Sequence, residues 1–183
     1  MDKAAEIFDL YKRLGDKEYI GEPVSQLEHA EQAAHLASLE TDDPYIILAA
    51  FLHDIGHICE PANLENSMNG FGMISHEKVG ADFLRKMEIP ERIAYLVEQH
   101  VQAKRYLTYS QPEYFNQLST ASKMTLEFQG GIMTPLEALS FEENDDFLVI
   151  LRLRQWDEAA KEIGQNLNFI DHYENMLRSI LVR

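Results

Sequence analysis

Hydrophobic residues recur every three or four positions along most of the chain, which is the spacing of a helix with one buried face. In residues 3–14, Ile7, Leu10, Tyr11 and Leu14 follow this spacing, and Gly15 comes directly after them. Glycine is common just past the end of a helix. The pattern therefore predicts an amphipathic helix over residues 3–14.

The same criterion predicts seven further helices, at residues 24–39, 45–59, 74–87, 91–104, 112–128, 142–160 and 169–181. Residues 45–59 are almost continuously apolar, which indicates a buried helix. Residues 60–73 are rich in Asn, Gly and Pro and predict a loop, long enough to act as a lid. No pair of alternating strand segments is visible, so we predict an all-α fold.

The length of 183 residues fits one domain, which we expect to span residues 1–183 with a metal-binding core at about 19–158. The formal charge of −15 argues against nucleic-acid binding, because phosphate backbones require clustered Lys and Arg. No long apolar stretch predicts a membrane span, and no secretory signal is visible. The lone cysteine, Cys59, fits a reducing cytoplasm, and we interpret it as a small buried residue.

The strongest local signal is the run His53-Asp54-Ile55-Gly56-His57 inside an otherwise apolar helix. Burying imidazoles and a carboxylate is costly unless they pair or bind a metal. Asp54 has two oxygens and could bridge two ions. His57 lies one turn beyond His53 on the same face, where it could contact a ligand held by the metals.

Further histidines extend this cluster over separate predicted helices. The ordered set is His29, His53, Asp54, His76, His100 and Asp157. Any one of these histidines alone would be interpreted as a hydrogen-bonded core or surface residue. Together they are what an octahedral two-metal site between facing helices requires. We assign no chemical role to His35, which faces elsewhere on its helix, or to His172.

A second set of polar side chains indicates a small anionic substrate. Lys104 lies one turn after His100, and Arg154 lies one turn before Asp157. Three further residues form a stripe at i, i+3 and i+7 that could donate hydrogen bonds to a tetrahedral oxyanion: Ser122, Thr125 and Gln129. The alternatives are that Lys104 is an ordinary surface lysine and that the stripe is a solvated helix face.

The ordered histidines and aspartates resemble the HD-domain superfamily. This resemblance implies that one metal is held by His29, His53, Asp54 and Asp157. It implies that His76 and His100 hold the other, with Asp54 bridging the two.

Further segments resemble the 2-amino-1-hydroxyethylphosphonate dioxygenase group, relatives of myo-inositol oxygenase. They are residues 19–22, 26–29, 76–82, 100–107, 118–122, 125–127, 129–131 and 154–158. The resemblance implies two iron ions in a mixed-valent Fe2+/Fe3+ pair, with O2 and a small organophosphonate as substrates. The expected products are phosphate and glycine or an N-methylated analogue.

The resemblance also implies roles for individual side chains. Tyr19 occupies an iron position until substrate arrives, and Glu22 faces the amino group of the substrate. The phosphonate is held by His57, Lys104, Ser122, Thr125, Gln129 and Arg154. Tyr19, Glu22 and His57 are the expected catalytic residues.

Two other functions fit the same ligand set. One is a metal-dependent phosphohydrolase acting on a nucleotide or small phosphoester, in which a metal-activated water attacks the ester. The other is a non-catalytic HD module that binds a ligand. The substituent on the substrate amine and the oligomeric state stay open.

Overall fold

The computed structural model describes the whole chain except residues 1, 20, 61–67, 69–72, 166 and 183. Within the described residues it contains helices and no strand, which confirms the all-α prediction. The helices are α1 Lys3–Leu14, α2 Gln26–Ser38, α3 Pro44–Leu52, α4 Gly56–Cys59, α5 His76–Lys86 and α6 Glu91–Ser110. They continue with α7 Pro112–Gln117, α8 Thr120–Phe128, α9 Pro135–Glu142, α10 Phe147–Ala159 and α11 Ile170–Leu181.

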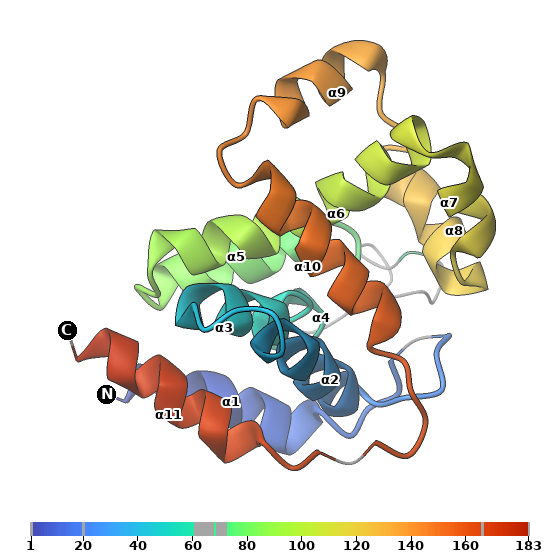
Figure 1. Cartoon of the computed structure of the whole chain (residues 1–183). Coiled ribbons are helices and arrows are strands. Elements are labelled where there is room, and N and C mark those ends of the chain that lie inside the picture. The colour runs from blue at the N-terminus through green and yellow to red at the C-terminus, as the bar shows by residue number, and fades with distance from the viewer. Residues whose placement is uncertain (1, 20, 61–67, 69–72, 166, 183) are drawn as a thin grey trace.

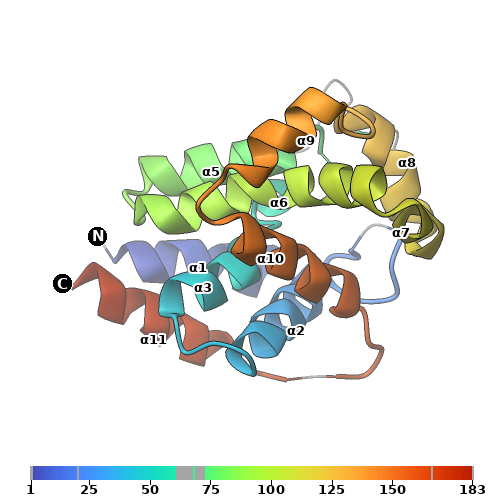
Figure 2. The same cartoon turned by 45° about the horizontal axis from the view of Figure 1, so that its top comes forward.

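Four helices form the centre of the molecule: α2, α3, α6 and α10 pack on one another, and α5 packs along α6. Fully buried alanines such as Ala34 on α2 and Ala49 on α3 let these helices approach closely. The terminal helices α1 and α11 lie side by side against one flank of this centre (Figures 1 and 2). The central helices carry most of the site described below.

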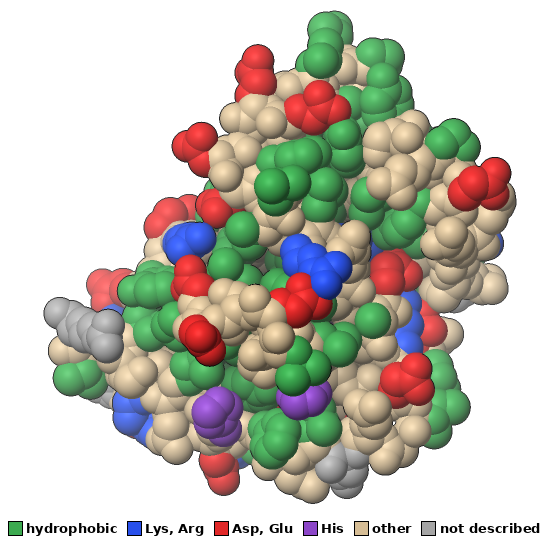
Figure 3. All heavy atoms as spheres, viewed as in Figure 1, with side chains coloured by type: hydrophobic (Ala, Val, Ile, Leu, Met, Phe, Trp, Pro, Cys, Tyr) green, Lys and Arg blue, Asp and Glu red, His purple; other side chains and the backbone are tan. Residues whose placement is uncertain are grey.

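The helix α9 lies at the edge of the molecule and was not predicted from the sequence (Figure 2). It packs inward through Ala138 and Phe141. Its outer face is apolar at the top of Figure 3, where Leu136 is 79% exposed and Leu139 is 60% exposed. Thr134 and Glu137 form a capping box that starts it, a signal present in the sequence.

The prediction of one helix over residues 45–59 is wrong, because α3 ends at Leu52 and α4 begins at Gly56. Between them the backbone changes to shorter i→i−3 hydrogen bonds, such as that from Ile55 N–H to the Leu52 carbonyl (3.0 Å). Apolar content alone does not reveal such a change. The tightened turn carries His53 and Asp54.

Two other predicted helices also differ from the structure. Residues 112–128 form two helices, because Leu118 is extended and the Ser119 side chain caps α8 by accepting from Ser122 N–H. The predicted helix at 142–160 begins only at Phe147. Most of the predicted loop at 60–73 lies outside the described residues. No helix among the described residues is long and apolar enough to cross a membrane.

Candidate metal centre and its cavity

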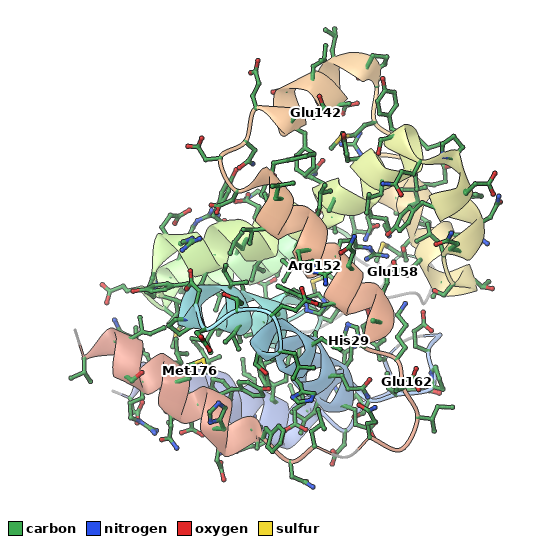
Figure 4. The ribbon with its side chains drawn as sticks, viewed as in Figure 1. His29, Glu142, Arg152, Glu158, Glu162 and Met176 are labelled. Atoms are coloured by element: carbon green, nitrogen blue, oxygen red, sulfur yellow. The ribbon has the colours of Figure 1, made fainter. Side chains whose placement is uncertain are left out.

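The histidines and aspartates predicted as metal ligands meet at the centre of the fold. His29 is on α2, His53 and Asp54 follow α3, His76 begins α5, His100 is on α6 and Asp157 is on α10. None of these six residues is more than 7% exposed. His29, labelled in Figure 4, extends from α2 to the carbonyl of Ala160 just past the end of α10. The packing of the helices therefore brings residues from a stretch of 129 positions, 29 to 157, together in one cluster.

Four donor atoms surround one point, which we call the four-donor half. The Nε2 atoms of His29 and His53 are 3.1 Å apart. Asp157 Oδ1 lies 3.4 Å from His29 Nε2 and 3.7 Å from His53 Nε2. Asp54 Oδ2 completes the group at 3.7 Å from His29 Nε2 and 3.4 Å from His53 Nε2.

Three donor atoms form a second group, the three-donor half. The Nε2 atoms of His76 and His100 are 3.1 Å apart. Asp54 Oδ1 lies 3.1 Å from His76 Nε2 and 3.5 Å from His100 Nε2. The two oxygens of Asp54 thus face different halves, which is the arrangement of a bridging carboxylate.

Backbone carbonyls orient three of the four histidine rings. The Nδ1 of His29 donates to the Ala160 carbonyl (2.8 Å). The Nδ1 of His53 donates to the Ala50 carbonyl (2.8 Å), and that of His100 donates to the Val97 carbonyl (2.7 Å). Because Nδ1 carries the proton, Nε2 presents a lone pair to the cluster. His76 differs, since its Nδ1 has no hydrogen-bond partner and lies 3.6 Å from Glu77 Oε2.

A close contact between two glycines brings His76 to the cluster. A Cβ added to Gly56 would lie 1.9 Å from the His76 carbonyl oxygen, and one added to Gly80 on α5 would lie 3.0 Å from Gly56 N. Only glycine allows this approach of α4 to the first turn of α5. The glycine in the His53–His57 run therefore helps to build the three-donor half.

The donor set fits metal ions. In octahedral coordination, neighbouring ligands at a metal–nitrogen distance of about 2.1 Å are about 3 Å apart, close to the observed separations. Asp157 Oδ1 is buried without a hydrogen-bond partner. Burial would lower the pKa of His53, but Asp54 and Asp157 together raise it to about 10. The cluster therefore demands a positive charge, which bound metals would supply.

His57 lies beside the three-donor half, with its ring stacked on His76 at a centroid distance of 4.1 Å. One of its ring nitrogens is within 4.8 Å of the donor atoms of Asp54 and His76. The backbone N–H of Met73 donates to Nδ1 (3.2 Å), so in the neutral ring Nε2 carries the proton. Burial, followed by repulsion from His76, lowers the pKa of His57 to about 3. His57 is thus a neutral hydrogen-bond donor beside the metals.

A tight turn presents Tyr19 and Glu22 to the cluster. The Glu22 N–H donates to the Tyr19 carbonyl (2.8 Å), and Gly21 has φ of 79°, a conformation that favours glycine. The Tyr19 ring stacks on His29 with centroids 4.0 Å apart, and Tyr19 shares the cavity wall with Asp54. Burial and then Asp54 raise the pKa of Tyr19. Both predicted residues of this motif reach the site.

The described residues line a small cavity of about 50 Å³ on the side of the three-donor half. All the residues predicted to contact substrate lie in its wall, and so does Tyr19: the substrate set is Glu22, His57, Lys104, Ser122, Thr125, Gln129 and Arg154. The Gln129 Oε1 atom is buried without a partner. A cavity of this size accepts only a small molecule.

Lys104 is the least compensated charge in this wall. It is 2% exposed, and its ammonium donates to Thr125 Oγ1 (3.0 Å) and the Ser122 carbonyl (3.4 Å), both neutral groups. Burial, followed by repulsion from Arg154, lowers its pKa to about 7. An anion in the cavity would supply the missing countercharge.

Arg154, in contrast, is held by several partners. Its guanidinium pairs with Asp157 Oδ2 and Glu158, and it donates to the Tyr114 hydroxyl (2.9 Å). It also reaches Ser122 Oγ at 3.4 Å. Burial opposes its charge, but Asp157 and Tyr114 raise its pKa overall. Arg154 therefore links Asp157 of the four-donor half to the cavity.

Sequence reasoning missed one charged residue at this site. Lys161 pairs with Glu22, with Nζ 2.9 Å from Oε1. The two residues are 139 positions apart, and no local pattern connects them.

Three residues to which the sequence assigned no role at the site are His35, His172 and Cys59. His35 packs near Phe169, and His172 packs near Tyr173. Burial raises the pKa of Cys59 to about 12, so its thiol is protonated at neutral pH.

Comparisons with known proteins identify the family. The model of the HD domain matches residues 26–176, most of the chain. The chain belongs to the HD-domain family. This confirms the HD resemblance and accounts for the buried cluster between central helices.

Three relatives align with nearly the whole chain. A 1-hydroxy-2-(trimethylamino)ethylphosphonate dioxygenase (glycine-betaine-forming) from Leisingera caerulea is 38% identical, over 94% of this chain and 87% of the relative. A hydroxymethylphosphonate dioxygenase from Gimesia maris is 37% identical, over 98% and 89%. An uncharacterized protein of Acanthamoeba polyphaga mimivirus is 40% identical, over 93% and 78%. The resemblance to phosphonate dioxygenases seen in the sequence is confirmed.

Proposed function

We propose that this protein is a di-iron oxygenase that uses O2 to cleave the carbon–phosphorus bond of a small 1-hydroxyphosphonate. The names of two relatives support the reaction class. The observation that carries the proposal is the Tyr19 phenol, which stacks on the predicted metal ligand His29 and lies in the cavity wall. A phosphohydrolase needs only metals and an activated water, and has no use for a phenol there.

The proposed cofactor is a mixed-valent pair of iron ions held by His29, His53, Asp54, His76, His100 and Asp157. Histidine and carboxylate ligands suit redox iron. The irons would bind O2 and pass to it the electrons that the substrate gives up. Within this proposal, His76, His100 and Asp54 would hold the iron that takes the substrate hydroxyl, and the Tyr19 phenol would yield its place when substrate arrives.

The chain's own residues orient the phosphonate. Lys104 provides a buried ammonium without a carboxylate partner among the described residues, and Arg154 provides a fixed guanidinium. His57 donates from Nε2, and Ser122, Thr125 and Gln129 complete the polar wall. Charge-assisted bonds in a site sheltered from water bind anions strongly. These contacts would hold the phosphorus–carbon bond beside the three-donor half.

The finer proposal, taken from the sequence resemblance, is a substrate with an amino group on the second carbon. For 2-amino-1-hydroxyethylphosphonate, one molecule of O2 converts the substrate to glycine and phosphate, a four-electron oxidation that needs no external reductant. Glu22 is the proposed contact of the amino group.

Phosphate release tests the proposal directly. Iron-loaded protein in air should release one phosphate for each O2 consumed from a small 1-hydroxyphosphonate. The anaerobic sample should release none, because oxygen atoms from O2 are needed to balance the products. Phosphate release that continues without O2, or from a phosphoester instead, would favour the hydrolase function.

A further inference from the structure

The carboxylate expected to recognise a substrate amine is already occupied by a cation of the chain. Glu22 Oε1 lies 2.9 Å from Lys161 Nζ. The Glu22 side chain is only 9% exposed and that of Lys161 only 14% exposed, so water screens this pair little. A substrate ammonium can therefore reach Glu22 only in competition with Lys161.

Lys161 is held in this position by its backbone. The preceding carbonyl, of Ala160, accepts from His29 Nδ1 at 2.8 Å. The following residue, Glu162, exchanges two hydrogen bonds of 2.9 Å with the side chain of Gln32 on α2. Figure 4 labels Glu158 near the end of α10 and Glu162 in the segment that follows. Lys161 lies between these anchored residues, so its side chain is directed at the cavity wall.

The Glu22–Lys161 pair ends a row of alternating charges that leads to the metal centre. Lys161 Nζ also lies 4.0 Å from Glu158 Oε2. Glu158 pairs with Arg154, which pairs with Asp157. Each carboxylate in this row has a cation beside it, so the wall near Glu22 has little net negative charge.

We infer that Lys161 determines specificity for the group on the second carbon of the substrate. This inference rests on the proposed function. By neutralising Glu22, Lys161 removes much of the advantage of a cationic amine. A 1-hydroxyphosphonate without a cation binds without displacing any charge. An amine-bearing substrate must first separate Glu22 from Lys161.

Binding measurements under anaerobic conditions test this inference without turnover. The probes are 2-amino-1-hydroxyethylphosphonate and hydroxymethylphosphonate, titrated into the full-length, metal-loaded protein by calorimetry. Lys161→Met keeps the length of the side chain and frees Glu22. The ratio of the two dissociation constants should then shift about tenfold in favour of the amine, the effect of one charge-assisted contact. Lys161→Gln should give the same shift if Lys161→Met fails to fold.

Matched variants separate this effect from a change in overall charge. Lys161→Arg retains the cation and should keep the parent ratio. Lys78→Met removes the same charge from a side chain that is 61% exposed and should also keep it. The double variant Glu22→Gln with Lys161→Met should return the ratio to the parent value, because the freed carboxylate is gone.

The outcomes distinguish the two proposals. If both phosphonates bind the parent protein and the ratio does not move in Lys161→Met or Lys161→Gln, the role of Lys161 is wrong while the proposed function stands. If neither phosphonate binds the parent protein, the proposed function is wrong and the inference falls with it.

Discussion

The two halves of the metal centre differ in how completely the chain surrounds them. The four-donor half has two histidines oriented by backbone carbonyls and an aspartate whose second oxygen is held by Arg154. The three-donor half has fewer protein donors, and the Nδ1 of His76 is unpartnered. An octahedral metal would keep about two free positions in the first half and about three in the second.

This difference indicates where a chelating substrate would bind. A substrate that offers two oxygens to one metal needs adjacent free positions, and the three-donor half has more of them. The cavity and Lys104 lie on the same side. Two donors of the four-donor half, His29 and Asp157, instead come from α2 and α10, which pack against each other. We therefore expect the four-donor half to hold its metal tightly and the three-donor half to exchange ligands.

Removing the shared carboxylate should have the largest effect. Wild-type protein should carry close to two metals per chain by elemental analysis. Asp54→Ala should lose both, because Asp54 supplies one oxygen to each half. Asp157→Ala should lose mainly the metal of the four-donor half, since the donor residues near Asp157 Oδ1 are His29 and His53 of that half. His35→Ala is the control and should retain both metals. An Asp54→Ala protein with one tightly held metal would contradict the bridging arrangement.

Tyr19 tests whether a phenol occupies an exchangeable position at the metal centre. A phenolate bound to ferric iron absorbs visible light, so the oxidised iron protein should be coloured. Tyr19→Phe should lose the band while retaining iron, and a phosphonate substrate should bleach it in the parent protein. Tyr114→Phe is the matched control, because that phenol bonds to Arg154 instead. A band that survives Tyr19→Phe would exclude the phenol as a ligand.

Gly56 tests how the three-donor half is built. Gly56→Ala would place a Cβ against the His76 carbonyl and force α4 and α5 apart. We expect a loss of about 3 kcal/mol in the free energy of unfolding and weaker binding of the metal at His76. At Gly164, with φ of 80°, an added Cβ would meet nothing within 4 Å. Gly164→Ala should therefore cost only about 1 kcal/mol of backbone strain. Equal losses in chemical denaturation would contradict the close-contact explanation.

Lys104 tests the cavity rather than the metals. Lys104→Met should weaken phosphonate binding about 30-fold, the effect of about 2 kcal/mol from a lost charge-assisted bond. Metal content should not change. The same variant should raise the melting temperature, because it removes a buried ammonium whose contacts are neutral groups. Unaltered affinity would mean that the phosphonate does not contact Lys104.

Much of this site could be predicted because its ligands form an ordered set spread over separate helices. His29 and His76 lie on helices predicted to within two residues of their observed bounds, whereas the helix of His100 continues to Ser110, six residues beyond its predicted end. The break at His53 was missed, because apolar content does not distinguish α-helical from tighter turns. The Glu22–Lys161 pair could not be predicted either. It depends on where the segment after α10 is anchored, which is a property of the tertiary structure.

The smallest expected effect is a pH dependence of phosphonate binding in the cavity of the three-donor half. Because burial lowers the pKa of Lys104 to about 7, its ammonium is present below that pH and is lost above it. Affinity should therefore decrease about fivefold between pH 7 and 8 relative to a permanently charged side chain. Lys104→Arg provides that reference, since a guanidinium keeps its proton throughout this range. The ratio of the two dissociation constants cancels the titration of the phosphonate itself.

The same shift has a predictable effect on stability. An unfolded lysine keeps its proton up to its ordinary pKa of 10.5, whereas folded Lys104 loses it near 7. The unfolded state binds more protons between these values, so this residue's contribution to stability should rise with pH across that window. Lys104→Met should abolish the rise in denaturation experiments. The stability of the parent protein is compared with that of Lys104→Met, and its phosphonate affinity with that of Lys104→Arg. If both differences stay constant from pH 6 to about 9, Lys104 keeps its charge over that range. The ammonium would then need a compensating anion in the cavity even before substrate binds.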